Sequence, residues 1–157
     1  MQVLWPYLLP VLPIAILAKE DFYRRRVGLF WLILSGVSLA IVGYAVEGIC
    51  VMALHFACNT ILAGILFGFI VFWYRIWHRR PFRKFFIHCF GLGDVVLMLI
   101  VGLLFAPVDY IRFLLFSNLL ALLWWVLLRN KRRKTIPLVG FMAIVLIGYS
   151  LHKFFGL

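Results

Sequence analysis

The chain has 157 residues, 66% of them hydrophobic, and its mean hydropathy is +1.10. A soluble domain is typically about half apolar, so this composition excludes a water-soluble globular protein and predicts that a lipid bilayer covers much of the surface. The formal net charge of +11 would suggest nucleic-acid binding in a soluble protein. Here the basic residues lie in short clusters between apolar runs, which is how membrane topology is encoded. We therefore expect no nucleic-acid partner.

Six apolar segments follow one another along the chain, and a membrane span needs roughly 20 apolar residues. The segments cover about residues 3–18, 27–46, 49–74, 93–106, 111–128 and 136–151. The first contains Pro6, Pro10 and Pro13, which predicts a kinked or partly unwound helix that its neighbours compensate. The sequence therefore predicts an all-α integral membrane protein with about six transmembrane helices, in which residues 1–157 form a single domain.

The basic residues are concentrated in the connections after the first, third and fifth segments. These connections hold 14 of the 16 basic residues, namely Lys19, Arg24, Arg25, Arg26, Arg75, Arg79, Arg80, Arg83, Lys84, Arg129, Lys131, Arg132, Arg133 and Lys134. The other side has only Arg112 and Lys153. The positive-inside rule then predicts cytoplasmic basic loops and places both termini outside.

Two of the five acidic residues, Asp21 and Asp94, fall at the same predicted depth. Asp21 lies just after the first segment and Asp94 at the start of the fourth, so both are expected at the cytoplasmic edge of the membrane. Glu47 and Asp109 fall on the opposite side. Two carboxyls at one depth, from different spans, can meet in one site. Glu20 is an alternative partner for Asp94, because it directly precedes Asp21.

A pair of aspartates can hydrolyse a peptide bond without a metal. Like charges a few ångströms apart do not both ionise easily, so one pKa rises. The ionised partner takes a proton from water, and the protonated partner donates to the carbonyl oxygen. The pair titrates as a unit, so the sequence assigns neither role to one residue. The alternative to catalysis is that the arginines at 24–26 only neutralise the charge of Asp21 and that Asp94 is only solvated.

Gly91 and Gly93 precede Asp94, and glycine lets another backbone approach closely. We expect these two glycines to open space for an extended substrate segment beside Asp94. Cys50, Cys58 and Cys89 lack the spacing of a zinc site. Neither a metal nor an organic cofactor is expected.

At these residues the chain resembles the type IV prepilin peptidases and their archaeal preflagellin-peptidase relatives, which are GxGD membrane aspartyl proteases. The first shared motif is an aspartate followed by a basic stretch, here residues 21–27 (DFYRRRV). The second is GxGD before an apolar helix, here residues 91–97 (GLGDVVL). The third is an Ile-Pro start to the last span, here residues 135–141 (TIPLVGF). The three motifs together extend over essentially the whole chain.

The resemblance implies a multi-pass aspartic endopeptidase of the cytoplasmic membrane, with Asp21 and Asp94 as catalytic residues, in type IV pilus assembly or protein secretion. The implied substrate is a pilin-like precursor, cleaved between its short basic leader and its apolar helix. Family members often have Ile-Pro-Asn where this chain has Val27, Gly28 and Leu29, and Pro-Phe-Gly-Pro where it has residues 137–140 (PLVG). These departures concern substrate choice. The chain also lacks the family's N-methyltransferase region, so we expect cleavage without N-methylation.

Two other functions remain open from the sequence. One is an ion- or proton-coupled transporter that uses the same aspartates, although such sites are expected nearer the middle of the membrane. The other is a non-catalytic membrane subunit of a pilus or secretion machine. A transporter should lose flux when Asp94 is replaced, and an assembly subunit should be indifferent.

Overall fold

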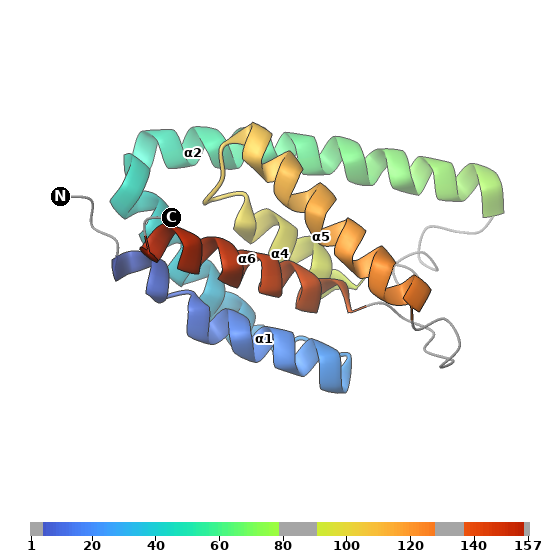
Figure 1. The fold of residues 1–157 in the computed structure, drawn as a ribbon. Helices are drawn as coiled ribbons and strands as arrows, with labels where there is room; N and C mark the ends of the chain where they lie inside the picture. Colours follow the sequence, from blue (N-terminus) through green and yellow to red (C-terminus); the bar gives the residue numbers. More distant parts are fainter. Residues whose placement is uncertain (1–4, 79–90, 128–136, 156–157) are drawn as a thin grey trace.

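The computed structural model describes residues 5–78, 91–127 and 137–155, and the secondary-structure elements in these ranges are all helices (Figure 1). The elements are a short 3-10 helix, η1 (Trp5–Leu8), and the α-helices α1 (Val11–Arg24), α2 (Leu29–His78), α4 (Leu92–Val101), α5 (Pro107–Leu127) and α6 (Leu138–Phe155). The prediction of an all-helical protein is confirmed for this part of the chain.

Three of the described helices are long and apolar enough to cross a membrane: the stretch Leu29–Trp73 of α2, then α5 and α6. Their outward side chains include large apolar groups such as Ile65, Phe69 and Leu119, each more than 60% exposed. A surface of this kind requires lipid around it. The described residues thus have the helical, multi-pass character of a membrane protein, with three such helices among them. The count of six spans stays a prediction.

In two places, the predicted segments 3–18 and 93–106, the helix in the structure covers only part of the apolar segment. Pro6 and Pro10 divide the first segment into the turn η1 and the helix α1, since proline cannot donate a backbone hydrogen bond. Helix α4 ends at Val101, well before the predicted end at residue 106. Beyond it the backbone turns through residues 102–106 into α5.

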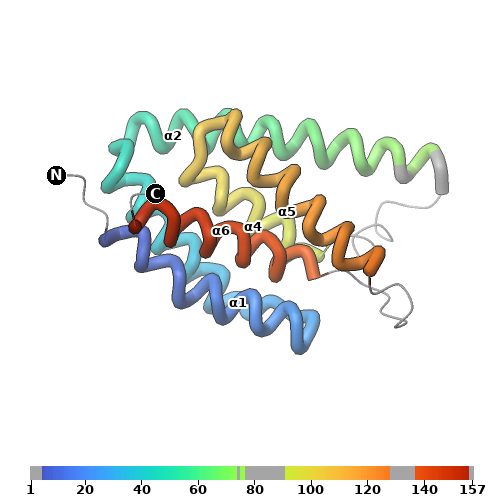
Figure 2. Tube along the Cα trace, viewed as in Figure 1, coloured from blue at the N-terminus to red at the C-terminus, as the bar shows by residue number. Residues whose placement is uncertain are grey.

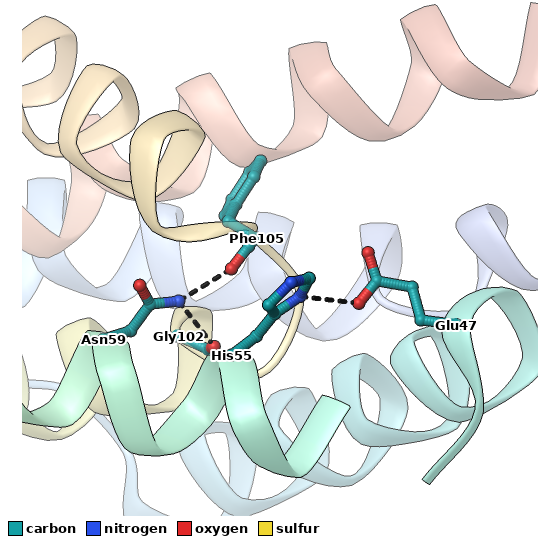
Figure 3. Close-up of polar contacts among 5 residues, drawn as sticks. All are labelled: Glu47, His55, Asn59, Gly102 and Phe105. Atoms are coloured by element: carbon teal, nitrogen blue, oxygen red, sulfur yellow. Dashed lines mark hydrogen bonds and ion pairs between the residues drawn. The ribbon is translucent and has the colours of Figure 1, made fainter. Parts of the chain in front are cut away.

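Helix α2 is two arms joined at Gly48, where the backbone has φ 78° and ψ 166°. Only glycine adopts such dihedrals without strain. The sequence predicts a break here, between the segments that end at residue 46 and begin at residue 49. The trace in Figure 2 turns sharply and the second arm runs back along the bundle. Across the turn, His55 Nδ1 lies 2.7 Å from Glu47 Oε2 (Figure 3).

The core lies where α6 packs between α1 and α5 (Figure 1). Ile14 and Leu17 of α1 and Ala143 and Leu146 of α6 are fully buried there. The buried positions recur every three to four residues in each helix, which is the spacing of one helical face. Helix α6 therefore positions α1, which carries Asp21.

One end of the bundle collects the predicted cytoplasmic connections. In Figure 1 the last turn of α1, the first turn of α4, the last turn of α5 and the first turn of α6 all point to this end, and both termini lie toward the other. Arg24 is the last residue of α1 here, and Arg25 and Arg26 follow it. Of the other two basic connections, Arg75 lies in α2, and the remaining basic residues fall in residues 79–90 and 128–136, outside the described residues.

Candidate functional site

Asp21 lies in the last turns of α1 and is buried, with 7% of its surface exposed. Its Oδ2 accepts a hydrogen bond of 2.7 Å from the backbone N–H of Gly140, in the first turn of α6. The first N–H groups of a helix have no partner within the helix, and they favour a negative charge. The start of α6 therefore favours the ionised form of Asp21, against the effect of burial, which raises the pKa of this carboxyl. The sequence places Asp21 after the first span, whereas the helix continues past it to Arg24.

The bond to Asp21 depends on the close approach of α1 and α6 at Gly140. A Cβ on this residue would lie 2.7 Å from Cε2 of Phe22. The Phe22 ring also meets Phe141 edge to face, with 5.3 Å between ring centroids. Glycine at position 140 thus makes room for the aromatic ring beside Asp21.

Asp94 lies in the first turn of α4, where it caps its own helix. Its Oδ2 accepts a hydrogen bond of 2.9 Å from the N–H of Gly91, and its own N–H donates to the Gly91 carbonyl oxygen over 3.1 Å. The bond from the Asp94 carboxyl to the N-cap amide is one half of a capping box, and the Gly91 carbonyl oxygen takes the place of the side chain that glycine lacks. The carboxyl is therefore fixed in orientation by the glycine that begins the GxGD motif.

Asp21 and Asp94 come from different helices, and both lie near the start of α6: the Gly140 N–H bonds Asp21, and the Val139 backbone acts on Asp94. Both residues lie outside the three helices long enough to span a membrane. Burial raises the pKa of Asp94 to about 6. The hydrogen bond from the Gly91 N–H lowers this pKa, the negative charge of Asp21 raises it further, and the Val139 backbone lowers it. Burial also raises the pKa of Asp21, against the lowering effects of the Gly140 N–H and of the Arg25 charge. Two adjacent residues of α6 thus lower the pKa values of the two carboxyls: Val139 acts on Asp94, and Gly140 acts on Asp21.

The two glycines of the motif differ in their surroundings. Gly91 is exposed, and the nearest atom to a Cβ there would be Oδ2 of Asp94, at 3.2 Å. A Cβ on Gly93 would lie 3.1 Å from two side-chain atoms of Val27. Gly93 therefore makes room for the connection between α1 and α2, and the space expected beside Asp94 is found at Gly91 and not at Gly93.

The remaining acidic residues have other partners. Glu20 accepts a hydrogen bond of 2.9 Å from the Gly28 N–H, and Gly28 in turn accepts the N–H of Leu32 at the start of α2. Its carboxylate is thus engaged by the residue that precedes α2. Asp109 pairs with Arg112 on the surface at 3.0 Å. Glu47 contacts His55, so both of these acids are engaged at the opposite end of the bundle.

Sequence reasoning missed two residues that shape the site, Phe22 and Val27. Each is within six positions of Asp21, inside or beside the first motif, yet nothing in their spacing indicates a contact with α4 or α6. Residues 135 and 136 of the third motif lie outside the described residues. Among those described, no three His, Cys, Asp or Glu side chains are grouped so as to hold a metal ion.

Comparisons of the chain with family models, with curated proteins and with solved structures found no match.

Proposed function

We propose that this protein is a membrane-embedded aspartic endopeptidase in which Asp21 and Asp94 activate water against a peptide bond. The observation that carries the proposal is that these two carboxyls, from α1 and α4, lie at adjacent amides of α6: the Gly140 N–H bonds Asp21, and the Val139 backbone and the charge of Asp21 both act on Asp94. Two neighbouring carboxyls with raised pKa values are the arrangement needed for one to serve as acid and the other as base.

The chemistry needs one proton shared by the pair. The ionised carboxylate removes a proton from water, the hydroxide adds to the scissile carbonyl carbon, and the protonated carboxyl donates its proton to the carbonyl oxygen. The proton taken from water then passes to the leaving amine as the C–N bond breaks, while a hydroxyl of the tetrahedral intermediate returns its proton to the other carboxylate and becomes the carbonyl of the new carboxyl group. The pair returns to a state with one proton, so no other group is consumed.

For the substrate we propose a pilin-like precursor, cleaved where its basic leader meets its apolar helix. The carboxyl pair supports this choice because it lies at one end of a bundle of apolar helices, where such a junction would reach the membrane surface. We also propose that the six apolar segments all cross the cytoplasmic membrane, with this end in the cytoplasm. An impermeant maleimide should then label a cysteine at Arg112 in intact cells, and one at Arg24 only after permeabilisation, once the native cysteines are replaced.

The decisive experiment is co-expression with a tagged pilin-like precursor from the same genome, followed by measurement of the precursor's size and new N-terminus. Asp21→Asn and Asp94→Asn should each lower cleavage by about 10²–10⁴-fold, the contribution of general acid–base catalysis. Asp109→Asn is the matched control, because Asp109 is an exposed aspartate at the other end of the bundle.

The rival functions give different results in the same strains. A correctly inserted parent protein that processes no such precursor contradicts the peptidase. Loss of ion flux in Asp94→Asn would then favour the transporter, and an assembly defect unaffected by either substitution would favour the assembly subunit.

A further inference from the structure

Gly93 marks a close contact between α4 and the connection that leads from α1 to α2. It lies in the first turn of α4, directly before Asp94, and its φ is not positive. Alanine forms helices better than glycine, so the backbone alone does not explain a glycine here. A Cβ at this position would lie 3.1 Å from Cβ and Cγ2 of Val27, inside the usual carbon–carbon separation of about 3.5–4.0 Å. Glycine at position 93 therefore leaves room for Val27.

The connection that carries Val27 is fixed to the end of α1. At its start, the N–H of Arg25 donates to the carbonyl oxygen of Asp21 over 3.2 Å. At its end, the N–H of Gly28 donates to the carboxylate of Glu20 over 2.9 Å. Val27 lies between these two bonds and packs, partly buried, against the core. Its side chain therefore has a defined position relative to the last turns of α1, which carry Asp21.

The contact between Val27 and Gly93 acts on the turn that holds Asp94. The carboxyl of Asp94 accepts the N–H of Gly91 in this turn, so the carboxyl moves with the turn. Among the described helices, α1 packs mainly on α6 and α2, and α4 packs mainly on α2. The placement of the first turn of α4 relative to the end of α1 therefore depends on the few residues that connect the two, and Val27 is one of them.

We propose that Val27 is a positioning residue that sets how closely the first turn of α4 approaches the end of α1, and thereby the separation of Asp94 from Asp21. Its methyl groups take no part in proton transfer, so it acts through the placement of α4. The effect on catalysis rests on the proposed peptidase activity, because two carboxyls share a proton only when they are close. The placement of α4 does not depend on that activity and is tested separately.

Changes of side-chain size on the two sides of this contact should have opposite effects. Gly93→Ala adds a methyl group where there is no free space, so it should move the first turn of α4 away from the end of α1. Val27→Ala removes two methyl groups from the same contact, so it should let the turn approach. The two changes should offset each other when combined, which a general loss of stability would not produce.

Cross-linking measures this placement without any cleavage. Tyr23→Cys near the end of α1 and Leu92→Cys at the start of α4 are introduced together after the native cysteines are replaced, because both side chains are exposed, by 85% and 73%. Bifunctional thiol reagents of graded length are applied to the protein in detergent. The shortest reagent that joins this pair in the otherwise unchanged protein is then used for every variant.

The variants added to this pair are Gly93→Ala, Val27→Ala and the combination of the two. Val145→Ala is the matched control, because it removes two methyl groups from a partly buried valine of α6 that packs against the core. The same variants without the introduced cysteines are assayed for kcat and KM with the tagged precursor.

The cross-linking yield should fall in Gly93→Ala, rise in Val27→Ala and return to the parent value in the combination. Val145→Ala should leave the yield unchanged and should not restore it in Gly93→Ala. In the cleavage assay, kcat of Gly93→Ala should fall about 10²-fold with KM unchanged, as for a misplacement of about 1 Å, and Val27→Ala should restore it.

A yield that Val27→Ala changes neither alone nor together with Gly93→Ala overturns the inference. Val27→Ala tests the placement by itself if Gly93→Ala does not fold. Recovery of the yield without recovery of kcat overturns the role of Val27 in catalysis. A parent protein that cleaves no precursor, in a series with the expected yields, overturns the peptidase and leaves the placement of α4 by Val27 standing.

Discussion

The ring of Phe22 occupies the space in which residue 140 would carry a side chain: a Cβ on Gly140 would lie 2.7 Å from the ring. This contact sets how closely α1 approaches the first turn of α6. It therefore also sets the 2.7 Å hydrogen bond from Gly140 to Asp21.

Replacing Gly140 with alanine should separate α1 from α6 at the site. The added methyl group has no free space, and overpacking of this kind costs about 1–3 kcal/mol. We expect a lower melting temperature in detergent and a large loss of cleavage. Gly148→Ala is the control, because a Cβ at Gly148, in the same helix, meets nothing within 4 Å. Alanine there should be neutral or slightly stabilising. Equal behaviour of the two variants would contradict the role of the Phe22 contact.

The stability of the protein should fall as the pH rises through the titration of Asp94. Its pKa is raised from 3.8 to about 6, first by burial. Between these values the folded protein binds more protons than the unfolded chain, so the free energy of unfolding decreases with pH. The expected decrease from pH 4 to pH 7 is roughly 1–2 kcal/mol. Melting curves at several pH values in one detergent measure it.

Asp94→Asn should weaken this dependence and stabilise the protein at pH 7 while abolishing cleavage, since the amide oxygen can still accept the Gly91 N–H. Stability gained at the expense of activity is expected when a strained catalytic group is replaced. Asp109→Asn should leave the pH dependence as in the parent. A parent melting temperature that rises between pH 5 and pH 7 would argue against a raised pKa at Asp94.

Glu20 should serve the fold and not the chemistry. Because its carboxylate accepts the Gly28 N–H, Glu20→Gln keeps an acceptor and should behave like the parent. Glu20→Ala removes the acceptor and should lower stability by about 1 kcal/mol, as for other helix caps. Cleavage per folded molecule should persist in both variants. If Glu20→Gln abolished cleavage as Asp94→Asn does, Glu20 would replace Asp21 as the partner.

Asn59 should be the polar residue whose loss destabilises the bundle most. It is buried in α2, and its Nδ2 donates to the carbonyl oxygens of Gly102 and Phe105, over 2.9 and 2.7 Å (Figure 3). These carbonyls follow α4, so Asn59→Ala would leave both unpaired, at a cost of about 1–3 kcal/mol each.

Asn118→Ala is the matched control for Asn59, since Asn118 is exposed and bonds only Leu114 in its own helix. Its replacement should change stability by less than about 0.5 kcal/mol. Activity of folded Asn59→Ala should remain, because Asn59 binds the turn at the end of α4 opposite to Asp94. A melting temperature as high in Asn59→Ala as in Asn118→Ala would refute this anchoring role.

Hydropathy and charge predict the positions of most helices, because apolar segments lie in lipid or in the core and charged segments lie in water. The helices follow the predicted apolar segments, and the break at Gly48 falls between two of them. The prediction also places Asp21 and Asp94 at one end. A change in hydropathy does not end a helix, however, and α1 continues through Asp21 because lysine, glutamate and aspartate do not break helices.

The contacts that build the site could not be predicted, because each joins residues far apart in the chain. Gly93 is followed by an aspartate in a recognisable motif, but nothing in the motif indicates that Val27 fills the space beside it. Gly140 likewise bonds a carboxylate 119 residues away. Such pairings depend on how the helices pack, which a single sequence does not encode in any local pattern.

The hydrogen bond from Gly140 to Asp21 also has a consequence for biosynthesis. Helix α1 leaves the ribosome well before its principal neighbour, α6, which follows it by more than a hundred residues. Until residue 140 has entered the bundle, the carboxyl of Asp21 lacks its amide partner. The two carboxyls therefore reach their final arrangement only after α6 is inserted, so a partly synthesised chain holds both aspartates without holding the site.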